Sequence, residues 1–259
     1  MAYLFKDTDL AARRLRVLAE VFEPASRAFL RDVAVNERPT LALDLGCGPG
    51  YTTRLVAEVT GCEQAFGMDA SEHFVARATA ENASKHISFV RHDLTQIPFP
   101  TGSGDLLFCR MLLTHLQDPL TALKRWGTQV RTHGLLLLDE VEWIRADHVM
   151  FQTYLGMVAA LLEQQVNQLY IGPVLDQYQP CGDLKRQASR VYQLPVSTRQ
   201  AATLFSLNIP SWKSQPFIQA TYPPEMIEWL ERELREMAEH ATGEGEITWG
   251  MRQVAYQRF

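Results

Sequence analysis

Short apolar runs alternate with helical patterns along the first 140 residues. The runs typical of strands cover 41–45, 63–68, 87–91, 105–111 and 135–138. Between them, apolar residues recur at the spacing of a helix. A strand that is buried on both faces has such a short, nearly continuous apolar run. The alternation therefore predicts a parallel sheet that helices cover on both faces.

The helices between these strands have recognisable ends. Gly61 follows the helical segment 52–59 and can end it in a left-handed conformation. Ser71 follows the second strand and can cap the next helix, because its hydroxyl can accept a hydrogen bond from the first turn. Pro119 suits the first turn of a helix after the fourth strand.

The pattern changes after residue 140. Apolar residues there recur at helical spacing without a strand between them, which predicts one long amphipathic helix. The residues of this pattern are Phe151, Tyr154, Leu155, Val158, Leu161, Leu162, Val166 and Leu169. The stretch 172–187 is predicted to be a connecting loop, followed by a strand at 190–196. A helix is predicted to begin at Pro224 and a closing strand to cover 247–256, and the first 35 residues are predicted to hold a pair of helices.

Composition is that of an ordinary globular protein. The chain has 259 residues, 46% of them hydrophobic and 21% charged, and a net charge of −5. This length suffices for one large core. Its basic residues, such as those in 13–16, lie within an apolar helical pattern, so we expect no nucleic-acid partner. No window is apolar enough for a membrane span, and we expect a cytoplasmic monomer or homodimer without a membrane partner.

The cysteines are scattered and form no CxxC pair. They are Cys47, Cys62, Cys109 and Cys181. None has histidines nearby at the spacing of a metal site, so we predict reduced thiols and no metal.

The first candidate for chemistry is the glycine turn, which we define as residues 44–50, Asp-Leu-Gly-Cys-Gly-Pro-Gly. Its glycines allow the backbone to approach a ligand, and the following helix presents free N–H groups at its start. A dinucleotide fingerprint would require glycine where Tyr51 stands. A pyrophosphate is therefore the poorer fit.

Two aspartates follow the next two strands. Asp69 lies 19 residues after Gly50 (69 − 50), where an acid can hold both hydroxyls of a ribose. Asp93 follows the third strand and can accept a hydrogen bond from an exocyclic amine such as that of adenine. Each aspartate alone is explained equally well as a helix cap. Together with the glycine turn they favour a nucleoside ligand at the carboxyl edge of the sheet.

This ordered set of motifs resembles the class I S-adenosylmethionine-dependent methyltransferases. The resemblance implies an α/β fold, a doubly wound Rossmann-like seven-stranded sheet that is mostly parallel, with its last strand antiparallel. It also implies N-terminal helices and an inserted helical lid, with 190–196 and 247–256 as strands six and seven. The resemblance covers about residues 41–142 and is carried by 43–50, 67–71, 92–94 and 134–136.

The resemblance also implies a cofactor, S-adenosyl-L-methionine, whose product is S-adenosyl-L-homocysteine. Gly46 and Gly48 would face the methionine part and Asp69 the ribose. Asp93 and Leu94 would lie at the adenine. The full set implied for cofactor binding is Asp44, Gly46, Gly48, Gly50, Asp69, Asp93, Leu94 and Arg110.

Methyl transfer requires an acceptor aligned with the C–S bond, and a base only if the acceptor has a proton to lose. His115 follows the fourth strand, where related small-molecule methyltransferases often have a histidine, and is the first catalytic candidate. A structural histidine is the alternative. Strand alternation directs one of Asp139, Glu140 and Glu142 into the crevice, and we select Glu140. The Arg110 carbonyl would meet the cofactor's amino group, while its side chain forms a salt bridge at the sheet end.

We expect one methyltransferase domain over 1–259. Its parts are N-terminal helices in 1–38, a cofactor-binding core in 39–142, a helical lid insertion in 143–188, and C-terminal strands and helices in 189–259. The residues expected to line the lid are Met150, Phe151, Tyr154, Met157 and Tyr170. Most of that stripe is expected to be core packing.

The expected function is methyl transfer to the oxygen, nitrogen or carbon of a small organic acceptor, as in secondary-metabolite biosynthesis. A non-catalytic methyltransferase-like binding subunit is one alternative, although the glycine turn is intact. A nicotinamide-dependent oxidoreductase is another, but it lacks the third glycine of its fingerprint.

Overall fold

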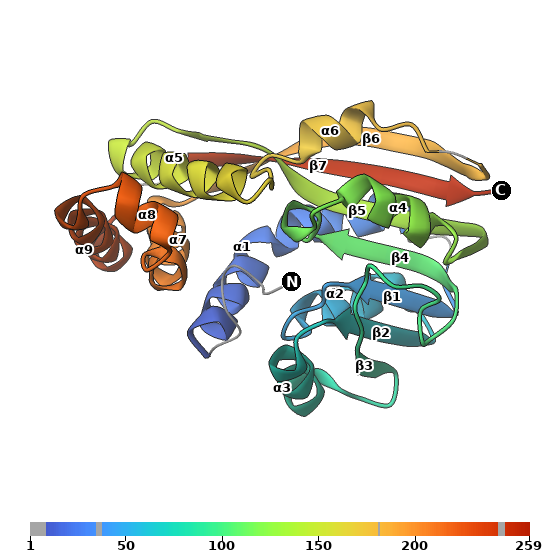
Figure 1. The fold of residues 1–259 in the computed structure, drawn as a ribbon. Helices are drawn as coiled ribbons and strands as arrows, with labels where there is room; N and C mark the ends of the chain where they lie inside the picture. The colour runs from blue at the N-terminus through green and yellow to red at the C-terminus, as the bar shows by residue number, and fades with distance from the viewer. Residues whose placement is uncertain (1–8, 35–37, 181, 243–246) are drawn as a thin grey trace.

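A computed structural model describes residues 9–34, 38–180, 182–242 and 247–259. Within this part of the chain, one sheet has the strand order β3-β2-β1-β4-β5-β7-β6 (Figure 1). The strands are β1 Leu41–Leu45, β2 Gln64–Asp69, β3 Ile87–Arg91, β4 Gly104–Arg110, β5 Val130–Ala146, β6 Leu184–Val196 and β7 Ile247–Arg258.

Helices precede, separate and follow these strands. They are α1 Asp9–Ala34, α2 Tyr51–Thr60, α3 Glu72–Asn82, the 3₁₀ helix η1 Leu113–His115, α4 Pro119–Gly127, α5 Val149–Gln164, α6 Gly172–Gln177, α7 Thr198–Trp212, α8 Pro216–Thr221 and α9 Pro224–His240.

Strand directions confirm the predicted doubly wound sheet. The pairs β1–β2, β2–β3, β1–β4 and β4–β5 are parallel, whereas β7 runs antiparallel to both β5 and β6. The strand order reverses between β1 and β4. In an open α/β sheet, ligands bind beyond the carboxyl ends of the strands at such a reversal.

Alternate residues of the central strands enter two different cores. Leu106 and Phe108 of β4 pack against α1 and α2, and Leu107 and Cys109 pack against α4 and α6. A third core joins α1, α5, α7, α8 and α9 to the first residues of β7. Figure 1 shows α5, α7, α8 and α9 gathered at one end of the molecule, beside the long strands β5 and β7.

Several predicted elements need correction. The first 34 residues hold one continuous helix over their described part, α1, and not a pair, although Pro24 lies within it. The predicted loop 172–187 contains α6 and the start of β6. Pro173 lies in the first turn of α6, where a missing N–H costs nothing, and β6 begins early because Leu184 pairs with Arg258.

The long helix predicted through Leu169 ends at Gln164. Beyond it Val166 has a φ of 61°, and its side chain is 84% exposed. The amide of Asn167 donates to the carbonyl oxygen of Leu162 and closes the end of the helix. Residues 198–221, for which no element is predicted from the sequence, contain α7 and α8.

Candidate active site

The glycine turn folds into a conformation that only glycine adopts easily. Gly46, Gly48 and Gly50 have φ values of 76°, 50° and 89°. A Cβ atom at Gly46 would lie 2.9 Å from the Leu112 side chain, and one at Gly50 would lie 2.7 Å from Phe89. Glycine is therefore required at these two positions by both the backbone and the space.

The first turn of α2 offers unoccupied N–H groups at the end of the glycine turn. Gly50 is the N-cap of α2, so no side chain caps the helix, and its first turn contains no acidic residue. Below it, Asp44 accepts hydrogen bonds from the hydroxyls of Thr52 and Thr53, at 2.6 and 2.7 Å. Burial raises the pKa of Asp44 to about 6. Asp44 thus braces the turn from inside the protein, a contact that the sequence pattern does not predict.

Asp69 links the glycine turn to the start of α3. Its two carboxylate oxygens accept hydrogen bonds from the backbone amides of Gly48 and Ser71, each at 2.9 Å. The side chain is half-buried. A carboxylate accepts several hydrogen bonds, which is the acceptor chemistry that the hydroxyls of a ribose require.

Asp93 lies further out, on the exposed side of the same edge. One of its oxygens accepts from the backbone amide and hydroxyl of Thr95, at 2.9 and 2.8 Å, and these bonds lower its pKa. The neighbouring Leu94 is buried, and its carbonyl oxygen accepts from the indole N–H of Trp126. Asp93 therefore holds a turn and does not cap a helix, and it stays accessible and ionised.

The N-terminal half of α1 lies over the glycine turn. Leu15 is the nearest side chain to the space in front of Gly48, at 3.6 Å from a Cβ placed there. Ala11 and Ala12 pack on Phe74 of α3. This half of α1 therefore covers the carboxyl edge of the sheet.

The side chain of Arg110 points away from that edge, toward the opposite half of α1. Its guanidinium donates to the hydroxyl of Ser26 at 3.2 Å, and that hydroxyl donates to Asp139 at 2.7 Å. All three side chains are buried. Arg110 and Asp139 thus join α1 to the sheet, and only the backbone of Arg110 remains for the predicted cofactor contact.

Glu140 lies on the other face of β5 and is fully buried. One carboxylate oxygen accepts from the backbone amides of Leu112 and Leu113, at 2.9 and 3.0 Å. Burial raises its pKa to about 7. The structure thus does not place Glu140 where it could contact an acceptor, because strand alternation fixes which residues share a face but not whether that face is open.

His115 ends η1, next to α1. Its side chain is half-buried. Burial, together with the positive charge of Arg14, lowers its pKa to about 3. His115 is therefore neutral near pH 7 and a much weaker base than an ordinary histidine.

Arg14 is a charged residue of this region that the sequence reasoning did not select. It is 7% exposed, whereas Arg13 and Arg16 face solvent. Its charge acts on Tyr154 of α5 as well as on His115. The available signal was its position, because Arg14 falls at helical spacing on the buried stripe of α1.

Core packing accounts for the apolar stripe expected to line a lid. The side-chain amide of Asn208 donates to the hydroxyl of Tyr154 at 2.6 Å, and the Tyr154 ring stacks on Phe205 with ring centroids 4.0 Å apart. Tyr170 is only half-buried. The fully packed members of the stripe are Met150, Phe151, Tyr154 and Met157.

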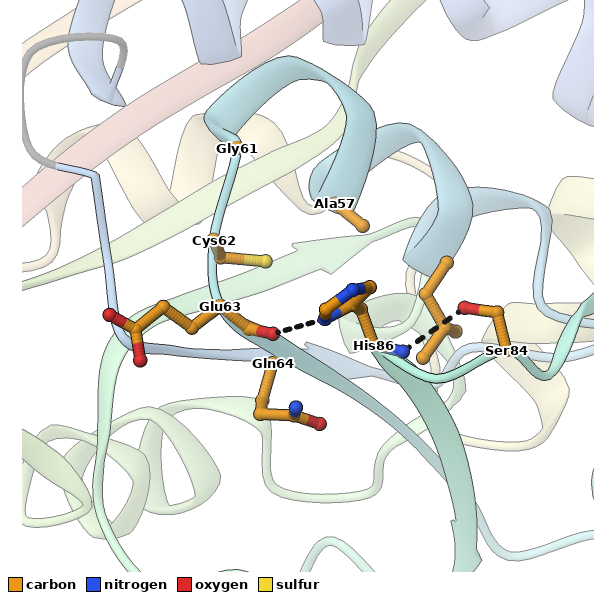
Figure 2. Close-up of a pocket in the computed structure, with 8 residues that line it drawn as sticks. Ala57, Gly61, Cys62, Glu63, Gln64, Ser84 and His86 are labelled. Carbon is orange, nitrogen blue, oxygen red and sulfur yellow. Dashed lines mark hydrogen bonds between the residues drawn. The ribbon is translucent and has the colours of Figure 1, made fainter.

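A separate pocket of about 590 Å³ lies at the opposite edge of the sheet, where β2 and β3 begin (Figure 2). It contains none of the predicted site residues. His86 points across it and contacts the carbonyl oxygen of Glu63 at 3.1 Å, and Cys62 lines the same space. Burial raises the pKa of the Cys62 thiol, which makes it less reactive.

None of the helices in the described ranges has both the length and the apolar character needed to span a membrane. The same part of the chain groups no three histidine, cysteine or acidic side chains in a way that could hold a metal ion.

Comparison with known proteins identifies the region that forms this site. Residues 43–138 match the family model described as a methyltransferase domain. A trans-aconitate 2-methyltransferase from Rhizobium etli is 36% identical over 101 residues, which cover 38% of this chain and 37% of that enzyme. The chain therefore matches little more than a third of this relative's length.

Solved structures resemble the chain over most of its length. A candidate methyltransferase from Bacillus halodurans C-125 has a TM-score of 0.57 and 14% identity, covering 90% of this chain and 98% of its own. Magnesium protoporphyrin IX methyltransferase from Synechocystis PCC 6803, solved with bound S-adenosylhomocysteine, has a TM-score of 0.52 and 16% identity, covering 97% and 89%. Residues 43–138 thus match a methyltransferase domain, and the sheet built around them has the fold of the class I S-adenosylmethionine-dependent methyltransferases.

Proposed function

We propose that the protein transfers a methyl group from S-adenosylmethionine to a small organic acceptor. The observation that carries this proposal is the glycine turn, whose positive-φ glycines and uncapped helix start lie beside Asp69. Together they would offer the N–H donors and the carboxylate acceptor that a charged nucleoside requires. A nicotinamide cofactor fits less well, because Tyr51 stands where its fingerprint needs glycine.

The residues of this edge suit the cofactor of the family. Gly46, Gly48 and the N–H groups at the start of α2 would hold its amino-acid end, Asp69 its ribose, and Asp93 with Leu94 its base. When bound, the cofactor supplies an electrophilic methyl group on a sulfonium. The protein's own contribution is then to bind, to orient the acceptor and to exclude water.

The acceptor side is proposed to lie between α1, η1 and α5, where Arg14, His115 and Tyr154 come together. Neutral His115 would orient the acceptor by a hydrogen bond. It would not act as a strong base, because its pKa lies near 3. Residues 143–188 are proposed to close this side as a lid.

Arg14 favours an acceptor that carries a negative charge. The residue is 7% exposed, and its positive charge acts on both His115 and Tyr154 of this side, where it would attract a negatively charged group. The relative from Rhizobium etli is named for trans-aconitate, a carboxylate. We therefore propose an acceptor with a carboxylate or a similar anionic group. We further propose that the enzyme works in the cytoplasm as a monomer or homodimer, without a nucleic-acid or membrane partner.

Calorimetry with S-adenosylhomocysteine tests the cofactor assignment. Binding is expected at micromolar or tighter Kd, on the order of −8 kcal/mol. NAD is the matched control ligand, and binding of NAD without binding of S-adenosylhomocysteine would refute the proposal.

Methyl transfer is tested with labelled S-adenosylmethionine and a panel of small carboxylic acids, each paired with its neutral amide. Labelled product is expected from acids and not from their amides. Transfer to amides in preference to acids would contradict the anionic acceptor but not methyl transfer itself. Cofactor binding without transfer to any compound of a metabolite extract would favour the non-catalytic binding subunit.

A further inference from the structure

The turn after β4, residues 111–115, joins the two sides of the proposed site. The Leu112 side chain fills the space in front of Gly46, 2.9 Å from a Cβ placed there. Three residues on, the amide of His115 donates to the carbonyl oxygen of Leu112 at 2.8 Å. A shift of the backbone at Leu112 therefore moves both the wall beside the glycine turn and His115.

The backbone enters this turn in an unfavourable conformation. Met111 has a φ of 51°, in the left-handed region that a residue with a Cβ atom seldom adopts. Its amide donates to the carbonyl oxygen of Asp139 at 3.2 Å. A residue in such a conformation persists only where its surroundings hold it.

Glu140, on the neighbouring strand β5, holds this turn in place. A single carboxylate oxygen accepts from the two consecutive amides of Leu112 and Leu113, at 2.9 and 3.0 Å. The thiol of Cys109 lies 3.5 Å from the same oxygen. Hydrogen bonds to a carboxylate are stronger than those between neutral groups, and here they act on the residues directly after Met111.

The second carboxylate oxygen of Glu140 is buried and has no hydrogen-bond partner among the residues that the structure describes. An apolar side chain of similar size would avoid the cost of burying that oxygen. It would also leave the amides of Leu112 and Leu113 without their acceptor, so what the carboxylate serves at this position is the turn. A requirement for the geometry of the turn explains why a carboxylate stands there.

We propose that Glu140 is a positioning residue, which fixes residues 111–115 so that the wall beside the glycine turn and His115 keep their places relative to the cofactor and the acceptor. This inference rests on the proposed function. Glu140 acts through the backbone of the turn and contacts neither ligand.

Glu140→Met and Glu140→Gln test this role, with Glu142→Gln as the matched control. Methionine removes both hydrogen bonds, whereas glutamine keeps one oxygen that can accept them. Glu142 lies two residues further along β5 and pairs instead with Arg252 at 2.7 Å. The first readout is hydrogen exchange at the amides of Leu112 and Leu113 in the ligand-free protein.

Exchange at these two amides is expected to be about tenfold faster or more in Glu140→Met, nearer the native rate in Glu140→Gln, and unchanged in Glu142→Gln. In transfer assays, kcat is expected to fall by about 10- to 100-fold in Glu140→Met, more than KM rises, because small misplacements at a reacting centre are costly. Glutamine should restore most of kcat.

Glu140→Asp serves where the methionine variant does not fold, because it keeps the charge but is one methylene too short to hold both amides. Native exchange rates and native kcat in the folded variants would overturn the proposal, as would a glutamine variant no better than methionine. Failure of the unsubstituted protein to bind S-adenosylhomocysteine would instead refute the proposed function, while amide exchange would still report whether Glu140 holds the turn.

Discussion

At the scale of single residues, the acids near the carboxyl edge of the sheet divide into two kinds. Asp44, Asp139 and Glu140 are buried and hold structure from within, whereas Asp69 and Asp93 keep contact with solvent. The sequence places all five near strand ends. It does not separate the two kinds, because alternation along a strand says nothing about which side a helix will cover.

Asp69→Asn is expected to weaken binding of S-adenosylhomocysteine without unfolding the protein. The amide side chain keeps one oxygen for the glycine turn but loses the charged acceptor for a ribose. A hydrogen bond to a charged group is worth about 1.5–3 kcal/mol, so Kd should rise roughly ten- to a hundredfold by calorimetry. Asp105→Asn is the control, since Asp105 accepts from the backbone of Leu41 and contacts Arg131 at the other edge. An equal Kd for both variants would mean that Asp69 only braces the turn.

His115 is expected to stay neutral from pH 8 down to pH 5. Its pKa of about 3 in the folded protein lies below its ordinary value of 6.5, so the unfolded chain takes up the proton first as the pH falls. The stabilisation that neutral His115 provides is thus complete above pH 6.5 and decreases as the pH falls toward 3. A nuclear magnetic resonance titration of the imidazole measures this directly, and a titration midpoint near 6.5 would contradict it.

The low pKa of His115 also predicts how substitutions at this position affect the rate of methyl transfer. Asparagine can hydrogen-bond but cannot act as a base, so His115→Asn should keep most of the rate if His115 orients the acceptor. His115→Ala should lose more. Equal losses of about 10²–10⁴-fold in both variants would instead assign general-base catalysis to His115.

At the scale of elements, α1 is the helix that departs furthest from expectation. Proline within a helix removes one backbone hydrogen bond, yet α1 continues through Pro24. Tertiary contacts explain the single helix. Beside Pro24, the side-chain amide of Gln253 donates to the carbonyl oxygen of Ala25 at 3.0 Å, and Ser26 bonds to Asp139.

Ser26→Ala is therefore expected to destabilise the fold by about 1–3 kcal/mol, because it leaves buried Asp139 and Arg110 without the hydroxyl between them. Urea unfolding measures the loss. Thr79→Ala is a suitable control, since the Thr79 hydroxyl bonds only to its own exposed helix. Equal stability of the two variants would show that Ser26 is dispensable.

At the scale of the whole molecule, the sequence predicts the elements that depend on nearby residues alone, most of which lie in the first half of the chain. Strands β1 to β4, the helix ends at Gly61, Ser71 and Pro119 and the glycine turn lie where their patterns place them. The remainder depends on contacts between distant segments. β5 extends to Ala146 because it pairs with β7 along its length, and the orientation of Glu140 follows from the turn that packs over it.

The sheet and the helical group α5, α7, α8 and α9 are expected to unfold in one transition. They share α1, and β5 and β7 enter both. Tryptophan fluorescence, to which Trp212 of α7 and Trp249 of β7 contribute from the core of the helical group, and far-ultraviolet circular dichroism should give coincident melting curves. S-adenosylhomocysteine at 100 times its Kd should shift both together, by about 2.7 kcal/mol. Two separated transitions would show that the parts fold independently.

The length of β5 has a consequence for redesign. Its 17 residues reach about 55 Å when extended, from beneath α4 to the start of α5. β5 and β7 pair along this length, and the helices α5, α7, α8 and α9 pack against their far end. A chimera that exchanges α5, α7, α8 and α9 for other helices but retains β5 and β7 would change the acceptor side. The strands and the glycine turn at the cofactor edge would stay unchanged.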